Sequence, residues 1–389
     1  MTDIIYLDNA ATTWPKPESV YHFAFDFFRN TGVNPGRSGF DKAIEAGNIL
    51  DDLRKRLTKF FGGDEDASER LCFGYNATDA LNLILYGLLR PGDHVVTTNL
   101  EHNSVIRPVN HLVRDNGIEA TYLPFNGRGF IEPDTVRKAI KSNTRLVIIN
   151  HGSNVLGTVQ PVKDIGEVCK DKGVLFAIDT AQTAGVIPIN MKEMNIDVLA
   201  FTGHKSLMGF TGIGGLCVRK HVDILQTRAG GTGVRSAYPY HLEEYPYRLE
   251  CGTPNLLGIA SLWAGQDWLD QQGMKNIWDH EMRLTRKLVA GFNEIPRVKI
   301  YGCDDLEHHL STVTMNIEGT EAGDVGIMLD VDHNIATRTG LHCAPLVHEQ
   351  LGIVPIHGGV RFAIGAFNTE QEIDASIKAV EHIAHLRKR

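Results

Sequence analysis

Short apolar runs alternate with amphipathic stretches between about residues 70 and 220. Seven of the runs have the length and the β-branched or aliphatic composition of strands, and they cover residues 70–73, 94–98, 120–123, 145–150, 174–178, 198–201 and 214–218. Apolar residues recur at helical spacing in the stretches between them, at residues 78–89, 104–115, 133–141 and 162–171. This alternation predicts an α/β fold, in which helices flank a mostly parallel seven-stranded sheet.

The pattern changes after Gly252. Two long helical patterns, 255–272 and 275–293, precede strand-like runs at 311–317 and 360–364, and a final helix is predicted over 369–387. We therefore expect a smaller α+β domain beside the sheet. The predicted large domain covers residues 15–255, and the small domain combines residues 1–14 with residues 256–389, including the linking helix.

Charge and cysteine content exclude several classes of protein. The 389 residues include 39 Lys and Arg against 47 Asp and Glu, a formal charge of −8, which argues against binding nucleic acid or an anionic membrane through bulk electrostatics. No apolar stretch approaches the ~20 residues of a spanning helix, and the first residues do not resemble a signal peptide. The six cysteines lack paired spacing, so we expect no disulfide framework and a cytoplasmic location.

Polar side chains follow four of the predicted strands, in segments 101–103, 150–154, 179–182 and 202–205. The carboxyl ends of strands in such sheets form the ligand-binding edge, so these segments predict one site. Asp179 and Lys205 lie 26 positions apart (205 − 179) on different strands. A lysine that forms a Schiff base and a carboxylate that keeps the pyridinium protonated are the pair that pyridoxal 5′-phosphate requires.

Sequence blocks across nearly the whole chain support this interpretation; they lie at 6–12, 101–104, 153–158, 179–182, 202–205, 252–255 and 338–343. In these blocks the chain resembles the class V aminotransferase group of pyridoxal-phosphate enzymes of fold type I. The resemblance is specifically to cysteine desulfurases and selenocysteine lyases.

The resemblance implies a role for each matched residue around the cofactor ring. Lys205 would form the Schiff base and move the Cα proton, and Asp179 would pair with the ring nitrogen. Gln182 would hydrogen-bond the ring oxygen, and His102 would stack on the ring and could shuttle protons. Asn154 would contact the cofactor or the substrate carboxylate.

The cofactor phosphate has its own implied ligands. Ala77 and Thr78 open a predicted helix, whose first N–H groups favour an anion. Thr202 and His204 match phosphate ligands in the family. Thr253 would be supplied by the partner subunit, which implies a homodimer.

Four residues are assigned to the substrate by the same resemblance. Arg361 would bind the α-carboxylate, with Arg338 and Arg37 at the rim. Cys343 would be the nucleophile, and its neighbours Arg338 and His342 are expected to favour the thiolate. The implied reaction takes sulfur from L-cysteine as a Cys343 persulfide, releases alanine and passes the sulfur to a protein or thiol acceptor.

Several alternatives share some of these residues. Selenocysteine could be the substrate, or the enzyme could be a β-lyase that acts on cysteine S-conjugates. A non-catalytic sulfur-transfer scaffold is a further alternative. The glycine run at 209–215 suggests a dinucleotide site only weakly, because it precedes a predicted strand instead of joining a strand to a helix. The Cys303, Asp304, Asp305, His308 and His309 cluster suggests a metal, but we favour a solvated loop and expect no metal site.

Overall fold

The computed structural model describes residues 4–35, 39–304 and 306–386. Its largest sheet has seven strands in the order β2-β8-β7-β6-β5-β3-β4. They are β2 (Leu71–Gly74), β3 (His94–Thr98), β4 (Glu119–Leu123), β5 (Thr144–Asn150), β6 (Leu175–Asp179), β7 (Val198–Thr202) and β8 (Gly214–Val218). Neighbours from β4 to β7 run parallel, whereas β8 is antiparallel to both β7 and β2. The predicted mostly parallel seven-stranded sheet is confirmed.

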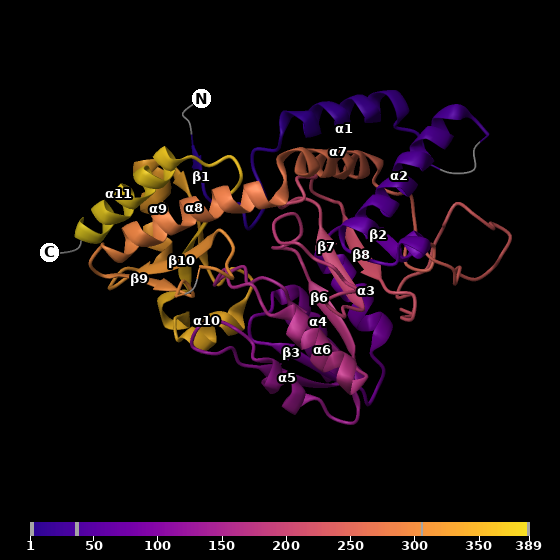
Figure 1. Ribbon diagram of the computed structural model, residues 1–389, viewed down its shortest axis with the longest axis horizontal. Coiled ribbons are helices and arrows are strands. Elements are labelled where there is room, and N and C mark those ends of the chain that lie inside the picture. Colours follow the sequence, from indigo (N-terminus) through magenta and orange to yellow (C-terminus); the bar gives the residue numbers. More distant parts are fainter. Residues whose placement is uncertain (1–3, 36–38, 305, 387–389) are drawn as a thin grey trace.

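Helices cover both faces of this sheet, which explains why its strands are almost continuously apolar. Alternate side chains of one strand belong to different cores: Ile148 packs with α3 (Ala77–Leu88) and α4 (Asn103–Asn116), while Ile149 packs with helices on the opposite face. The helices of the opposite face are α2 (Asp41–Phe60), α5 (Pro133–Ala139), α6 (Val162–Lys172) and α7 (Leu256–Gln272). Helix α1 (Glu18–Thr31) packs along α7 (Figure 1).

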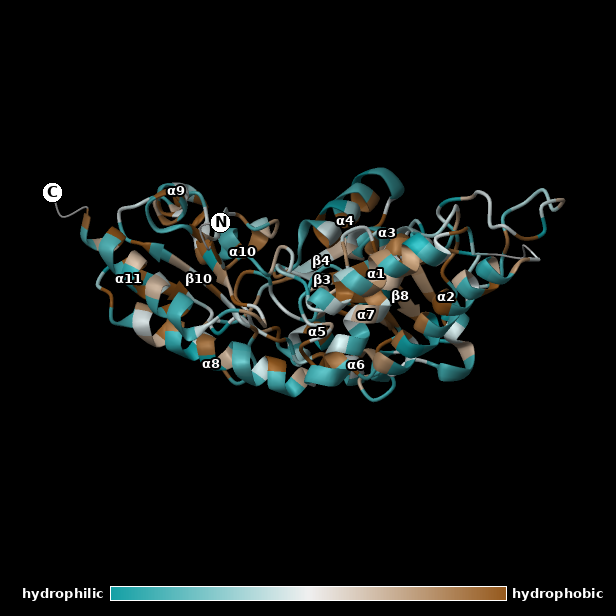
Figure 2. Ribbon diagram, turned by 90° about the horizontal axis from the view of Figure 1, so that it is seen from above, coloured by the Kyte–Doolittle hydropathy of each residue, from teal (hydrophilic) through white to brown (hydrophobic). Residues whose placement is uncertain are grey.

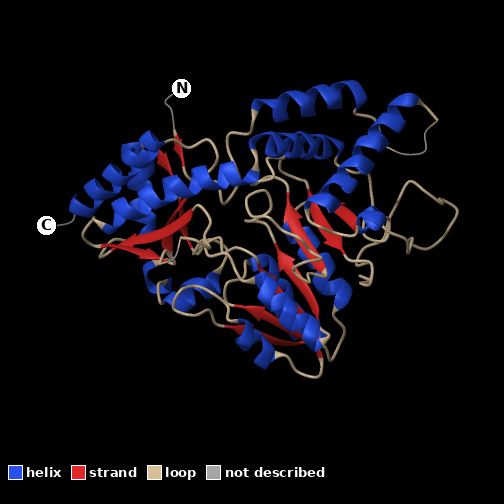
Figure 3. Ribbon diagram, in the orientation of Figure 1, coloured by secondary structure: helices blue, strands red, loops and turns tan. Residues whose placement is uncertain are grey.

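A second, antiparallel sheet lies apart from the first, so the strands form two groups (Figure 3). Its order is β12 (Arg338–Gly340), β13 (Gly359–Ala363), β10 (Thr312–Ile317) and β9 (Val298–Tyr301). Its core includes residues of α8 (Met274–Asn293), α9 (Ala322–His333) and α11 (Glu370–Leu386). Strands β10 and β8 are largely hydrophobic, while much of α8 is hydrophilic (Figure 2). The domain boundaries at 14/15 and 255/256 stay a prediction.

The N-terminal segment connects to this second sheet. Strand β1 (Ile5–Tyr6) pairs with β11 (Ile335–Ala336), and Asp8 forms a bridge to Ala363 at the end of β13. The remaining elements are the short helix α10 (Pro345–Leu351) and the 3₁₀ turns η1 (Glu65–Arg70) and η2 (Val354–Ile356). No helix in the described part of the chain is long and apolar enough to cross a membrane.

Candidate active site

A cavity of about 250 Å³ lies at the carboxyl ends of β5, β6 and β7 and extends to the second sheet. It brings together twelve of the predicted site residues: Ala77, Thr78, His102, Asn154, Asp179, Gln182, Thr202, His204, Lys205, Arg338, Cys343 and Arg361. Thr253 does not line this cavity, and Arg37 lies outside the described residues. Eight further lining residues were not predicted as site residues: Ala10, Ala11, Asn76, Ser104, Asn150, Gly152, Ala181 and His342. Five of them, Ala10, Ala11, Ser104, Ala181 and His342, lie in the sequence blocks that carry the resemblance, so these blocks could have identified them.

Adjacent parallel strands carry the lysine and the aspartate. Asp179 is the last residue of β6 and pairs with Ala200 of β7, and Lys205 follows β7 by three positions (205 − 202). Burial lowers the pKa of Lys205 to about 8, although the attraction of Asp179 opposes this shift. Burial raises the pKa of Asp179, against a hydrogen bond from the Ala181 N–H at 2.9 Å and the charge of Lys205. Lys205 is therefore easily converted to the neutral, nucleophilic amine.

One end of the cavity fits an anion. Helix α3 begins at Ala77, and Asn76 caps it by accepting a hydrogen bond from the N–H of Asp79 at 3.0 Å. The first-turn N–H groups of a helix lack intrahelical acceptors and attract negative charge. Thr202 Oγ1 and His204 Nδ1 are buried and have no hydrogen-bond partner among the residues that the structure describes. A phosphate group at this end would supply acceptors for these donors.

His102 caps the start of α4 and is held by hydroxyl groups. Its Nδ1 accepts a hydrogen bond from the Ser104 N–H at 3.1 Å, and Ser104 Oγ lies 2.7 Å from both His102 Nδ1 and Thr78 Oγ1. Burial, reinforced by the positive charge of Lys205, lowers the pKa of His102 to about 4. The ring is therefore neutral at neutral pH. Since its Nδ1 is an acceptor, the proton is on Nε2.

Cys343 lies in the loop between β12 and α10 and is exposed, whereas Cys72, Cys169 and Cys217 are buried. Both His342 and Cys343 have left-handed backbones, with φ of 50° and 57°. The Cys343 carbonyl accepts a hydrogen bond from the Asn103 N–H at 2.7 Å, and the His342 carbonyl accepts one from Asn154 Nδ2 at 2.7 Å. These bonds fix an otherwise unfavourable conformation at the mouth of the cavity.

One expectation about this loop is wrong. His342 was expected to supply positive charge to the Cys343 thiolate, but its ring is buried and its pKa is well below the ordinary value. Burial is the main cause, and the neighbouring charge of Arg361 adds to it. The positive charge that interacts with Cys343 therefore comes from Arg361, and not from His342.

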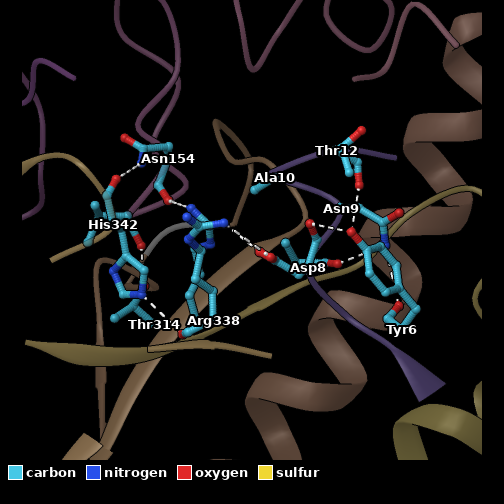
Figure 4. Close-up of polar contacts among 12 residues, drawn as sticks. Tyr6, Asp8, Asn9, Ala10, Thr12, Asn154, Thr314, Arg338 and His342 are labelled. Carbon is cyan, nitrogen blue, oxygen red and sulfur yellow. Dashed lines mark hydrogen bonds and ion pairs between the residues drawn. The ribbon is translucent and has the colours of Figure 1, made fainter. Parts of the chain in front are cut away.

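Arg361 is almost completely buried, at 2 % exposure, and its guanidinium forms an ion pair with Asp8. Asp8 also pairs with Arg338 (Figure 4). Arg361 Nη2 donates to Asp8 Oδ1 at 2.6 Å and Arg361 Nη1 donates to the Asn154 carbonyl at 3.0 Å. The more exposed Arg338 lies 3.5 Å from the second Asp8 oxygen. Arg361 thus forms a structural ion pair and lines the cavity as well. Asp8, in the first of the sequence blocks, was not predicted as a functional residue.

The two remaining sequence suggestions have simple structural settings. The glycine run at 209–215 leads directly into β8, as its position before a predicted strand indicated. Near the small sheet, Cys303 Sγ lies 3.7 Å from His309 Nε2, and burial raises the pKa of the thiol to about 12. Among the described residues, no three His, Cys, Asp or Glu side chains are grouped so that they could hold a metal ion.

The protein is therefore of the α/β class, and both a lysine and an aspartate line a cavity at the edge of its mostly parallel sheet. The family model Aminotransferase class-V matches residues 5–375, and the chain belongs to this family. The family predicted from the sequence blocks is confirmed.

Within the family, the similar proteins are cysteine desulfurases. The chain is 32% identical to a probable cysteine desulfurase of Methanothermobacter thermautotrophicus, over 99% of this chain and 96% of the relative. It is 30% identical to a cysteine desulfurase of Haloferax volcanii, over 98% of this chain and 89% of the relative. The apo structure of a cysteine desulfurase from Thermococcus onnurineus superimposes with a TM-score of 0.91 at 32% identity, covering 98% of this chain and 94% of the other.

Proposed function

We propose that this protein is a pyridoxal-phosphate-dependent cysteine desulfurase. It would convert L-cysteine to L-alanine and hold the removed sulfur as a persulfide on Cys343 for an acceptor. One observation carries this proposal: a single cavity joins the Lys205–Asp179 pair, the buried Arg361 and the exposed Cys343. The similarity to cysteine desulfurases over nearly the full chain supports it.

The residues of the cavity fit pyridoxal phosphate. Thr202 Oγ1 and His204 Nδ1, which lack a partner among the described residues, would hold the phosphate together with the start of α3. Asp179 would face the ring nitrogen. Gln182 and Asn154 also line the cavity, within the set that the resemblance assigns to the cofactor. When bound, pyridoxal phosphate links to an amino group and withdraws electrons from the substrate Cα.

The chain's own residues would then perform distinct tasks. Arg361 would bind the substrate α-carboxylate, and the Lys205 amine would take the proton from Cα and return it. The Cys343 thiolate would attack the substrate sulfur, forming an S–S bond as the C–S bond breaks. The electron pair of the C–S bond stays on the substrate carbon, which is protonated to give alanine. The sum balances: cysteine and the enzyme thiol give alanine and the enzyme persulfide.

We also propose a homodimer in which Thr253 reaches the partner's phosphate site. Thr253 is exposed and lines a second cavity, with Gly252 and Arg228, instead of the Lys205 cavity of its own chain. A residue from a second copy could therefore complete each site without a change in the fold.

Product analysis tests the proposal. The protein, loaded with pyridoxal phosphate, is given L-cysteine and a reducing thiol, and alanine, pyruvate and sulfide are measured. We expect alanine and sulfide in equal amounts. Pyruvate and ammonia would indicate a β-lyase, and a purified protein that takes up no cofactor and has no turnover would support a sulfur-transfer scaffold.

Replacement of the nucleophile separates the two desulfurising alternatives. Cys343→Ala should lose turnover of L-cysteine, while its cofactor absorbance stays like that of the parent. Cys303→Ala, at a partly buried cysteine outside the cavity, is the matched control and should retain activity. Retained turnover of selenocysteine by Cys343→Ala would favour selenocysteine lyase activity, and full turnover of cysteine would contradict the nucleophile assignment.

A further inference from the structure

Asp8 is held between two arginines of the proposed substrate site. Its Oδ1 accepts the 2.6 Å hydrogen bond from Arg361 Nη2, and its Oδ2 lies 3.5 Å from Arg338 Nη1 (Figure 4). Both arginines line the cavity, but Asp8 does not. The carboxylate therefore supports the guanidinium groups from outside the cavity and leaves the substrate position open.

The backbone fixes Asp8 in this place. The residue bridges to Ala363, with hydrogen bonds from the Ala363 N–H to the Leu7 carbonyl at 2.7 Å and from the Asn9 N–H to the Ala363 carbonyl at 3.2 Å. Arg361 is two positions before Ala363 on β13. The pairing between the N-terminal segment and β13 thus sets the geometry of the ion pair.

Arg361 keeps donors for a ligand. A guanidinium has five N–H groups. One is donated to Asp8 and one to the Asn154 carbonyl, while Arg361 Nε is buried without a partner among the described residues. Asp8 and Asn154 therefore orient the Arg361 guanidinium, and its other N–H groups remain available to bind a carboxylate in the cavity.

The charges define the kind of ligand. Arg361 and Arg338 contribute two positive charges and Asp8 one negative charge, so the subsite has a net charge of +1. This charge is complementary to one carboxylate. A second anionic group on the substrate would lack a cationic counterpart in the subsite and would lose its hydration without compensation.

We propose that Asp8 is a specificity-determining residue, which orients Arg361 and limits the carboxylate subsite to amino acids with a single anionic group. The proposal rests on the proposed function, since it assigns the cavity to an amino-acid substrate. It extends that function by naming the residue that sets the charge of the subsite.

The test uses Asp8→Asn, because an asparagine oxygen still accepts from Arg361 Nη2 while the negative charge is lost. In the holoenzyme, L-cysteate, a dianionic amino acid, should inhibit Asp8→Asn at least about tenfold more tightly than the parent, with a smaller change in KM for L-cysteine. Asp8→Ala also loses the acceptor and should raise KM by about tenfold or more without an equal fall in kcat.

A spectroscopic readout is independent of turnover. The charges of Asp179 and Asp8 raise the pKa of Lys205, and those of Arg361 and Arg338 lower it. Removal of the Asp8 charge should therefore move the pH titration of the cofactor absorbance to lower pH. The double variant Asp8→Asn with Arg338→Gln restores the net charge of +1 and should return both the titration and the inhibition by cysteate toward parental values.

Asp330→Asn, an exposed position on α9, is the matched control and should behave like the parent. If Asp8→Asn shows the parental titration and the parental preference between cysteine and cysteate, the proposal for Asp8 is wrong. If instead the parent takes up no pyridoxal phosphate or releases no alanine from cysteine, it is the proposed function that fails.

Discussion

Burial sets the charge of several side chains in and around the cavity. The ring of His102 is kept neutral and the pKa of Lys205 is brought to about 8. For two carboxyl groups, burial shifts the pKa upward instead of downward: it raises the pKa of Glu101 to about 8 and that of Glu281 to about 7. A neutral form is favoured each time, because a buried charge loses its hydration.

Glu281 gives a prediction about stability. Burial raises the pKa of this carboxyl group from its ordinary 4.5 to about 7, so the folded state holds the proton more tightly than the unfolded chain does. Glu281 therefore makes its full contribution to the free energy of unfolding below the pKa that it has in the unfolded chain. This contribution is lost as the pH rises from about 4.5 to about 7. Above that range the ionised group costs roughly 3 kcal/mol of unfolding free energy, from about 1.4 kcal/mol per pKa unit.

We expect Glu281→Gln to be more stable than the parent at pH 8 and to differ little from it at pH 4.5. The amide oxygen can still accept the hydrogen bond that Ser311 Oγ gives to Glu281 Oε2 at 2.8 Å. Urea denaturation at several pH values measures the difference. The exposed Glu318→Gln is the control, and an equal effect of Glu281→Gln at all pH values would contradict the prediction.

At the scale of elements, the loop between β12 and α10 determines where Cys343 lies. His342 Nε2 is 3.1 Å from the Arg338 carbonyl, and His342 Nδ1 is 3.2 Å from Nε2 of His348 on α10. Since a carbonyl only accepts, His342 carries its proton on Nε2 and accepts from His348 at Nδ1. Helix α10 thus holds the loop from within the protein, while Asn103 and Asn154 hold its backbone.

His348→Phe should loosen this loop. The phenyl ring fills much of the same space but donates no hydrogen bond, and one lost bond of about 1 kcal/mol corresponds to about fivefold in an equilibrium. We expect Cys343 to be alkylated by iodoacetamide about fivefold faster and the persulfide to form more slowly, with unchanged cofactor absorbance.

A second histidine pair supplies the control for this measurement. His382 Nδ1 lies 3.2 Å from His333 Nε2, on α11 and α9, away from the cavity. His382→Phe should leave the alkylation of Cys343 unchanged. Equal rates in His348→Phe and the parent would show that His348 does not hold the loop.

At the scale of the whole molecule, the position of Thr253 raises the question of a second subunit. Thr253 belongs to a cavity of about 460 Å³ that also involves Tyr247 and Glu250 and is separate from the Lys205 cavity. If a partner's Thr253 completes the phosphate site, Lys205 and the Thr253 that serves it lie in different chains.

Heterodimers test this arrangement. Lys205→Ala and Thr253→Asp should each abolish activity as homodimers, since the first lacks the amine and the second places a carboxylate beside the phosphate. A heterodimer with one copy of each variant, purified through two different tags, should regain one working site, built from the Lys205 of one chain and the Thr253 of the other. An inactive heterodimer, or a monomer in sedimentation, would contradict the proposal.

Local patterns predicted the seven strands of the large sheet because each contains a short apolar or β-branched run that is bounded by polar or turn-forming residues. Helix α1 was not predicted, since Phe23, Phe25 and Phe28 are 37 %, 51 % and 45 % exposed and obscure the apolar stripe of an amphipathic helix. Strands β1, β11 and β12 were not predicted either. They have only two or three residues each, and their pairing depends on partners far along the chain.

The sequence by itself determined the fold class, the family and most of the residues that meet in the cavity, because strand periodicity and motif blocks are local. Only the tertiary structure decided which side chains of the site are charged and which of them form ion pairs. His342 is neutral because the fold buries it, and Asp8 meets Arg361 across 353 positions because β1 and the segment after it dock beside β13. Burial and long-range ion pairs depend on neighbours that only the folded chain brings together.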